Sequence, residues 1–498
     1  MLFNSFHFLC FFPFVVTIFF LIPHRLQNYM LLICSYYFYM SWNPRYAVLI
    51  AASTLITYLS GRLIAWSHLK KNAKQANAEK RLWVFLSFAA NLSILFVFKY
   101  FDFAVTNINH VLSAVGMQLI QPEFDVMLPV GISFYTFQAL SYTVDVYRGE
   151  LPAEKSIMRY ALYVSFFPQL VAGPIERSAS LLEQFYTSHQ FDYDRVKRGL
   201  LLMMWGYFQK LIIADRASVL VDAVYDNVYA FSGVSIIVAT LLFAVQIYCD
   251  FAGYSNIAIG AAQVLGIRLM DNFKQPYFAT SIQDFWHRWH ISLSTWFRDY
   301  LYIPMGGSRL GTVRKYSNLL ITFFVSGLWH GASWSYVAWG GLHGIYQVVG
   351  NLLKPLRTKL LHALKVSDTT PIIRIIRTLG TFLLVDFAWI FFRAPGIRSA
   401  ILAIKKVLTE TRLEDALIGS SYILAGDEKN FMILCAAIML LFAVEALQYF
   451  KGFQFREIFL RQNTVVRWIL YYLFVIAILY FGVVVMSTTQ AQFIYFQF

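Results

Sequence analysis

Histidines are the residues in this sequence best suited to proton transfer near neutral pH. Four of the ten gather in the second half of the chain: His287, His290, His330 and His343. His330 ends an apolar stretch in the run SGLWHGASW, between Gly327 and Gly331. Flanking glycines allow a substrate or another backbone to approach closely, and a neutral imidazole can take a proton from a hydroxyl. A buried histidine can also simply bond a neighbouring helix, but the pattern favours a catalytic base at His330.

A second cluster of polar and aromatic residues fills 284–307, DFWHRWHISLSTWFRDYLYIPMGG. On helical spacing, Phe285, Trp289, Ser292 and Trp296 share one face, and Trp286, His290 and Leu293 share a neighbouring face. A helix lying at the membrane surface explains the aromatic and basic residues. The density of His, Arg and Asp fits a binding site equally well. The residues alone leave both interpretations open.

Several common chemistries have no motif here. The chain has no GxSxG elbow, no Walker P-loop and no HExxH helix. Its four cysteines lie in apolar segments without metal-ligand spacing, so we expect no metal and no tightly bound cofactor. Without an obvious covalent nucleophile, the histidines favour direct transfer from an activated donor to a hydroxyl.

The composition places the chain in a lipid bilayer. Hydrophobic residues make up 58% and charged residues 14% of the sequence, and mean hydropathy is +0.56. Soluble domains carry roughly a quarter charged residues. The formal net charge of +14 comes largely from basic residues in short loops such as 67–81. This distribution sets membrane orientation and does not indicate nucleic-acid binding. We therefore predict an all-α polytopic membrane protein with one domain, residues 1–498.

Apolar stretches of about 20 residues predict about twelve spans. They are residues 5–23 (a retained first span, not a cleaved signal), 28–43, 46–66, 82–100, 128–146, 197–214, 234–250, 316–332, 335–352, 373–392, 430–450 and 467–487. Residues 160–173 and 251–266 are shorter and contain Gly or Pro, so we expect them to be re-entrant. Basic loops at 67–81, 147–159, 353–377 and 451–467 predict a cytoplasmic location, with the loop 102–127 and both termini outside. The segment 393–429 fits that scheme poorly and is expected to lie along the interface.

Together the two histidine segments resemble the membrane-bound O-acyltransferase family. Within it, they resemble the branch that contains the membrane subunit of alginate O-acetylation and the D-alanyl transfer protein of teichoic acids. The resemblance extends to LPVGISFYTFQALSYTVDVYRG (128–149), FFPQLVAGPIER (166–177), YCDFAGYSNIAIG (248–260) and FIYFQF (493–498).

The resemblance implies a ring of helices around a central funnel, with His330 and His290 as the catalytic histidines. His287 stands where relatives accept other residues, so we expect no catalytic role for it, and we interpret His343, which also lies in family-like sequence, as structural. We expect the segment 284–307 to form a cytoplasmic entrance for the donor, lined by the candidate substrate-binding residues Trp286, Trp289, Ser292, Arg298, Asp299 and Trp329.

The implied donor is a cytoplasmic thioester, acetyl-CoA or an acyl-carrier protein. The implied partners are an extracytoplasmic SGNH-type acyltransferase and the polysaccharide biosynthesis machinery, at a bacterial inner membrane. D-alanyl transfer is the nearest alternative. A transporter or flippase is an alternative of another class, and the lack of an internal repeat argues against it.

Overall fold

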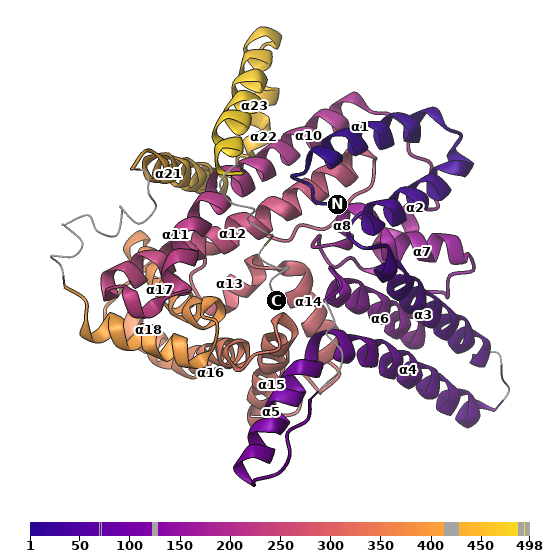
Figure 1. The fold of residues 1–498 in the computed structure, drawn as a ribbon, viewed down its shortest axis with the longest axis horizontal. Helices are drawn as coiled ribbons and strands as arrows, with labels where there is room; N and C mark the ends of the chain where they lie inside the picture. Colours follow the sequence, from indigo (N-terminus) through magenta and orange to yellow (C-terminus); the bar gives the residue numbers. More distant parts are fainter. Residues whose placement is uncertain (69, 71, 122–127, 413–427, 487–492, 494–498) are drawn as a thin grey trace. The chain divides into compact units, whose positions relative to one another are not determined.

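The computed structural model describes all residues except 69, 71, 122–127, 413–427, 487–492 and 494–498. All regular elements in the described part are helices, which confirms the all-α class (Figure 1). Contacts within the chain define two compact units. One comprises Met1–Leu200 with Ile257–Met270, and the other comprises Leu201–Asn256 with Asp271–Phe498.

The unit that begins at Met1 is built from helices of very different length. They are α1 (Phe6–Leu21), α2 (His24–Met40), η1 (Pro44–Tyr46), α3 (Ala47–Ser67), α4 (Ala73–Leu95), η2 (Phe96–Tyr100), α5 (Phe101–Ala114), α6 (Ile132–Arg148), α7 (Ile157–Ser165), α8 (Phe167–Leu170) and α9 (Ser178–Gln184), with the start of α10 (Tyr193–Tyr207) and the end of α12 (Gly233–Val264). Helix α6 packs against α3 and α4 and is buried over most of its length.

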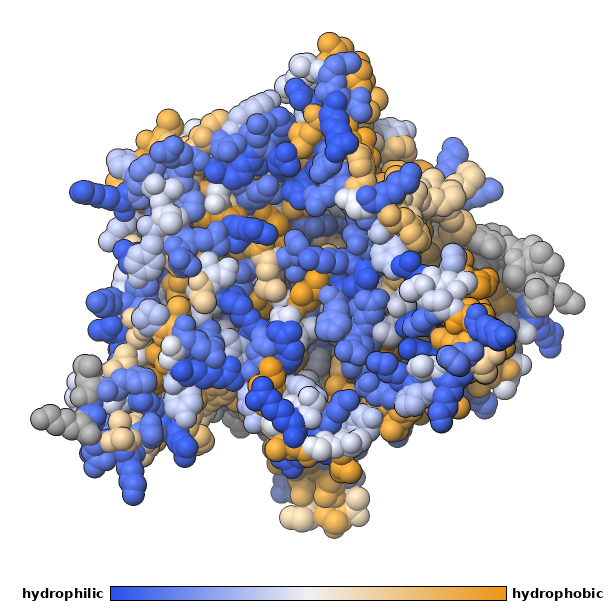
Figure 2. Space-filling model, turned by 180° about the vertical axis from the view of Figure 1, so that it is seen from behind, coloured by the Kyte–Doolittle hydropathy of each residue, from blue (hydrophilic) through white to orange (hydrophobic). Residues whose placement is uncertain are grey.

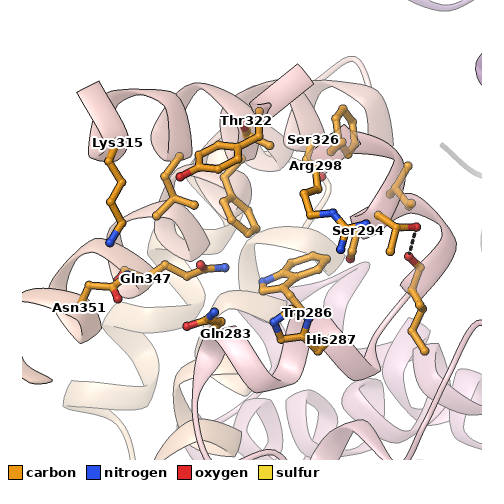
Figure 3. Close-up of a pocket in the computed structure, with 17 residues that line it drawn as sticks. Gln283, Trp286, His287, Ser294, Arg298, Lys315, Thr322, Ser326, Gln347 and Asn351 are labelled. Atoms are coloured by element: carbon orange, nitrogen blue, oxygen red, sulfur yellow. Dashed lines mark hydrogen bonds between the residues drawn. The ribbon is translucent and has the colours of Figure 1, made fainter. Parts of the chain in front are cut away.

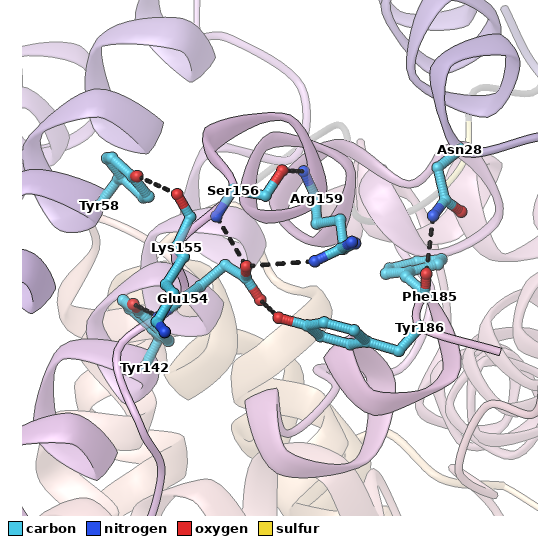
Figure 4. Close-up of polar contacts among 9 residues, drawn as sticks. All are labelled: Asn28, Tyr58, Tyr142, Glu154, Lys155, Ser156, Arg159, Phe185 and Tyr186. Atoms are coloured by element: carbon cyan, nitrogen blue, oxygen red, sulfur yellow. Dashed lines mark hydrogen bonds and ion pairs between the residues drawn. The ribbon is translucent and has the colours of Figure 1, made fainter. Parts of the chain in front are cut away.

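A buried carboxylate fixes the loop between α6 and α7 (Figure 4). Glu154 accepts hydrogen bonds from the Tyr186 hydroxyl at 2.6 Å and from the Ser156 backbone N–H at 2.8 Å. The guanidinium of Arg159 lies 3.7 Å from the same carboxylate. The Glu154 backbone N–H donates to the Tyr142 hydroxyl on α6 at 2.9 Å. Full pairing is what makes a charged group tolerable in a buried position.

The second unit holds the histidine segments. Its elements are the rest of α10 and α12, η3 (Phe208–Ala214), α11 (Asp215–Tyr225), η4 (Val228–Ala230), η5 (Pro276–Phe278), α13 (Ile282–Arg288), α14 (Ile291–Phe297), η6 (Arg298–Tyr302), α15 (Thr312–His330), α16 (Trp334–Ala363), α17 (Pro371–Arg393), α18 (Ile397–Thr409), α21 (Glu428–Lys451), α22 (Phe455–Leu460) and α23 (Thr464–Met486). Helices α15 and α16 pack at glycines, because a Cβ on Gly340 would lie 2.3 Å from the Phe323 carbonyl oxygen.

Six helical stretches in the described part are long and apolar enough to cross a membrane: Pro44–Ser67, Ala73–Ala114, Gly233–Val264, Pro371–Arg393, Glu428–Lys451 and Thr464–Gly482. They coincide with six of the predicted spans and support them by length and composition. The other six predicted spans also overlap helices, among them α1, α2, α6, α15 and α16, and remain predictions as membrane crossings.

Two predicted boundaries are wrong. The expected outer loop 102–127 is helical as far as Ala114, since α5 continues from α4 through η2 and only Gly116, at φ 70°, ends the run. Exposed apolar side chains of α5 appear as an orange projection at the bottom of Figure 2.

The expected re-entrant segment 251–266 is continuous with the preceding span in α12, a helix of 32 residues. Its Gly253 is a packing site, because a Cβ there would lie 2.8 Å from the Gly206 carbonyl oxygen. The other short segment, 160–173, is indeed broken, into α7 and α8. Part of the predicted interfacial segment 393–429 forms the amphipathic helix α18, and its residues 413–427 lie outside the described part.

Candidate active site

His330 is the last residue of α15 and is enclosed by aromatic rings. Only 3% of its surface is exposed. Its ring centroid lies 4.9 Å from that of Trp339, 5.0 Å from Trp329 and 5.4 Å from Phe392. These rings come from α15, α16 and α17. They surround the imidazole with apolar surface that excludes bulk water.

The glycines beside His330 serve protein packing. A Cβ on Gly331 would lie 2.2 Å from the Tyr336 ring, and a Cβ on Gly327 would lie 2.3 Å from the Tyr336 carbonyl oxygen. Of the two sequence interpretations, close approach of another part of the chain is therefore the one that the structure shows. The glycines hold the end of α15 against the start of α16.

His290 comes within reach of His330, with ring centroids 6.4 Å apart. It does so through a break in the helix, which corrects the expectation of one continuous helix over this segment. His290 has φ 44°, in the left-handed region, between α13 and α14. Phe285 and Trp289 still stack, at 5.4 Å, but Ser292 and Trp296 belong to the next helix.

Asn272 stabilises this break and was not singled out from the sequence. Its backbone carbonyl accepts the Ile291 N–H at 3.0 Å, and its side-chain oxygen accepts the Ser292 N–H at 3.3 Å. The same oxygen accepts from the Ser292 hydroxyl at 2.9 Å and lies 3.1 Å from His290 Nδ1. A lone asparagine in a loop carries no sequence signal for such a role.

The contact with Asn272 also defines the state of His290. An amide oxygen only accepts hydrogen bonds, so Nδ1 carries the proton and Nε2 keeps its lone pair. His290 is fully buried, and burial lowers its pKa to about 3. Its imidazole is therefore neutral at physiological pH.

A cavity of about 280 Å³ lies beside this centre (Figure 3). Its lining includes the predicted residues Trp286 and Arg298, together with His287, Lys315 and Ser326. In Figure 3, Lys315 and Arg298 stand on opposite sides of the cavity and Trp286 lies on its floor. Apolar side chains such as Leu293, Leu319 and Phe323 make up much of the remaining wall.

One row of α15 runs along this cavity toward His330. Lys315, Leu319, Thr322 and Ser326 line the cavity and follow the three- and four-residue spacing of a single helix face. His330 is the next residue in that row, four positions after Ser326. The cavity wall thus leads from a basic group to the buried histidine.

The other predicted site residues have varied surroundings. Trp329 contacts both histidines, with ring centroids 6.0 Å from His290. Trp289 is buried in the aromatic core and is not among the residues that line the cavity. Asp299 pairs with the exposed Arg298 at 2.7 Å. Ser292 is bonded to Asn272 beside His290.

His343 holds a structural position, as expected. Its Nδ1 accepts a hydrogen bond from the Trp286 indole N–H at 3.2 Å, which orients the cavity floor. No group of three or more His, Cys, Asp or Glu in the described residues could hold a metal ion.

The structure thus defines a helical membrane protein with two neighbouring buried histidines beside a cavity with basic residues on its lining, an arrangement suited to group transfer. Residues 52–392 match the membrane-bound O-acyltransferase (MBOAT) family. The chain is 38% identical, over 80% of its length and 72% of the relative's, to a probable alginate O-acetylase of Pseudomonas aeruginosa.

It is 35% identical, over 75% of its length and 72% of the relative's, to a peptidoglycan O-acetyltransferase of Helicobacter pylori. A teichoic acid D-alanyltransferase of Streptococcus thermophilus is 28% identical over 45% of this chain and 56% of its own length. The chain belongs to the MBOAT family and is an acyltransferase.

Proposed function

We propose that this enzyme moves an acetyl group from a cytoplasmic thioester donor toward the hydroxyl groups of an exopolysaccharide or cell-wall polysaccharide. The observation that carries the proposal is the pair of buried histidines, His330 and His290. Their ring centroids are 6.4 Å apart, and the pair lies beside a cavity lined in part by basic residues. The names of the relatives, an alginate O-acetylase and a peptidoglycan O-acetyltransferase, support acetyl transfer to a polysaccharide.

In this proposal the two histidines have different tasks. His330 takes the proton from the acceptor hydroxyl as its oxygen attacks the thioester carbonyl carbon. The carbon–sulfur bond then breaks, and the proton passes to the leaving thiolate, so that an ester and a thiol result. His290, a weak base with its lone pair on Nε2, accepts a hydrogen bond from the hydroxyl and orients it.

The cavity supplies the donor site. Arg298 and Lys315 offer positive charge to the phosphates of acetyl-CoA or of a carrier-bound pantetheine arm. The apolar wall accommodates the uncharged part of that arm. We further propose an extracytoplasmic SGNH-type acyltransferase as partner, a link to polysaccharide biosynthesis, and a bacterial inner-membrane location.

A second candidate is D-alanyl transfer from a carrier protein to teichoic acid, which the more distant D-alanyltransferase relative favours. Incubating the purified protein separately with radiolabelled acetyl-CoA, an acetylated carrier and a D-alanylated carrier distinguishes the donors. If label is transferred only from the D-alanylated carrier, the proposal of acetyl transfer is wrong and D-alanyl transfer takes its place.

The catalytic assignment is tested by His330→Ala, with His362→Ala as the matched control. His362 is exposed near the end of α16, away from the cavity lining. We expect polysaccharide O-acetylation to disappear in the first variant and to persist in the second, at equal protein abundance. Near-normal acetylation in His330→Ala would refute the assignment.

A further inference from the structure

A second cavity, of about 290 Å³, lies in the same unit and has a different character. Side chains and backbone from α10, η3, α12, the segment 271–275, α21 and the start of α22 line it. We call it the Glu445 pocket, after the acid in its wall. No residue of this lining is shared with the cavity beside His330.

Glu445 is a buried acid with incomplete hydrogen bonding. Only 3% of the surface of Glu445 is exposed, and the residue belongs to α21, one of the helices long and apolar enough to cross a membrane. The Tyr248 hydroxyl donates to Oε1, whereas Oε2 has no hydrogen-bond partner among the described residues. An ionisable group inside an apolar span is costly and by default indicates function. Oε2 itself is enclosed, so a donor in the cavity reaches it only when the carboxyl group of this lining residue turns, and a buried polar atom without a partner favours such a donor.

The walls around this acid are held in place. The Asn256 amide donates to Gln209 at 2.7 Å, and the Gln275 amide donates to Gln448 at 2.9 Å. The ammonium of Lys210, next to Gln209, lies 2.9 Å from a carboxylate oxygen of Asp215 and 2.5 Å from one of Asp250. None of the ion pairs among the described residues involves Glu445.

Aromatic faces and charges complete the pocket. Trp205 and Phe455, 4.5 Å apart, both line it and suit an organic cation. The charged residues in its lining are two acids and two bases: Glu445, Asp271, Lys274 and Arg456. Asp271 and Lys274 pair at 3.4 Å and are largely exposed, at 62% and 60% of their side chains, so Glu445 is the acid that lies inside and Lys274 lies toward solvent. This charge order matches a zwitterion that enters with its cationic end first.

The position of Glu445 along α21 places the pocket near the membrane surface. It lies six residues before the end of α21 at Lys451, which is about 9 Å along a helix. The 24-residue helix is about 36 Å long, slightly more than a hydrocarbon core of about 30 Å. Glu445 is therefore close to the level where headgroups meet the hydrocarbon.

We propose that the Glu445 pocket binds a phosphoethanolamine group, with its ammonium at Glu445 and its phosphate toward Lys274 and Arg456. The ammonium supplies the donor that Oε2 lacks and packs against Trp205 and Phe455. Soluble phosphoethanolamine is the source that this orientation favours, because in phosphatidylethanolamine the phosphate also carries the glycerol and acyl chains, which would then point toward solvent.

The first experiment compares ligands on the full wild-type chain in detergent. Phosphoethanolamine is titrated against 2-hydroxyethyl phosphate, which has a hydroxyl in place of the ammonium, by isothermal calorimetry. We expect the ammonium ligand to bind at least tenfold more tightly. Equal affinities, or no binding of either ligand at millimolar concentration, would overturn the proposal.

The second experiment changes the acid. Glu445→Gln keeps the shape and removes the charge, and Glu457→Gln makes the same change on α22 outside the pocket lining. We expect at least a tenfold weaker affinity for phosphoethanolamine only in Glu445→Gln, and the same affinity in both variants would contradict the site. If Glu445→Gln does not fold, the ligand comparison on the wild type decides alone.

The source is decided in nanodiscs that contain phosphatidylethanolamine or only phosphatidylcholine. Native mass spectrometry that shows retained phosphatidylethanolamine on the wild type, displaced by phosphoethanolamine, identifies the lipid as the source. Binding of the soluble ligand without retained lipid supports the same pocket with a soluble source.

Discussion

Replacing Asn272 by alanine should damage both the fold of the site and its chemistry. The buried amide bonds Ser292 through its oxygen, at 2.9 Å to the hydroxyl and 3.3 Å to the backbone N–H. It also contacts His290 Nδ1 at 3.1 Å and donates to the Ser255 hydroxyl at 3.2 Å. Alanine keeps only the backbone bond to Ile291. The Ser292 hydroxyl, the Ser292 N–H, the His290 N–H and the Ser255 hydroxyl each lose a partner, at about 1 kcal/mol each, so the variant should lose roughly 4 kcal/mol of stability.

The activity should fall for a separate reason. Without the amide oxygen, Nδ1 loses the hydrogen bond to Asn272 that fixes its proton, and the orientation that we propose for His290 is weakened. Loss of such an orienting partner lowers activity roughly tenfold to a hundredfold in metal sites, where its effect is best known, and we expect a similar loss here. Acyl transfer is measured on purified, monodisperse protein at a temperature where the variant remains folded, and stability is measured by denaturant unfolding in detergent.

Ser255→Ala is the matched control for Asn272. It removes only the partner of the amide nitrogen and leaves the oxygen contacts with His290 and Ser292 in place. We expect it to lose about 1 kcal/mol and to keep its activity. Full activity in folded Asn272→Ala, or an equal loss of activity in Ser255→Ala, would refute the proposed positioning of His290.

Three further changes probe the fold. Lys210→Met leaves two buried carboxylates without their cation and should lower the free energy of unfolding by about 3–5 kcal/mol. Adding Asp250→Asn removes one of these charges and should recover part of the loss. Denaturant unfolding that shows no recovery would contradict this coupling. Burial raises the pKa of the Glu176 carboxyl to about 7 from 4.5. The free energy of unfolding of the wild type should therefore fall by about 3 kcal/mol as the pH rises from below 4.5 to above 7. Glu176→Gln should not show this part of the pH dependence. Gly331→Ala places a methyl group 2.2 Å from the Tyr336 ring and should lower the melting temperature in detergent, an effect that Tyr336→Leu should relieve.

The helical class and much of the membrane pattern were predictable from composition and apolar run length. A glycine within an apolar segment does not by itself predict a break in the helix. Gly253 lies within the continuous helix α12 because a neighbouring backbone needs the space beside it. Run length also missed α5, because its polar residues face outward on a helix that continues past the apolar segment.

Within the site, the sequence indicated which residues matter but could not show how they meet. The approach of His290 to His330 depends on a left-handed residue that helical spacing does not anticipate. Asn272 lies 18 positions before His290, in a loop without any local motif. The Glu445 pocket joins segments that are about 250 residues apart, and only tertiary packing brings them together.

The surroundings of His330 favour transfer over hydrolysis. Water is a hydroxyl nucleophile like the acceptor, so a general base exposed to solvent would also promote loss of the acyl group to water. Trp329, Trp339 and Phe392 enclose the imidazole at centroid distances of 4.9–5.4 Å and keep bulk water away. The neutral His290 needs no counter-ion in such an environment, whereas the basic groups Arg298 and Lys315 belong to the lining of the neighbouring cavity. In the proposed reaction, the basic side chains therefore bind the donor in the cavity, and His330 takes the proton in the apolar centre.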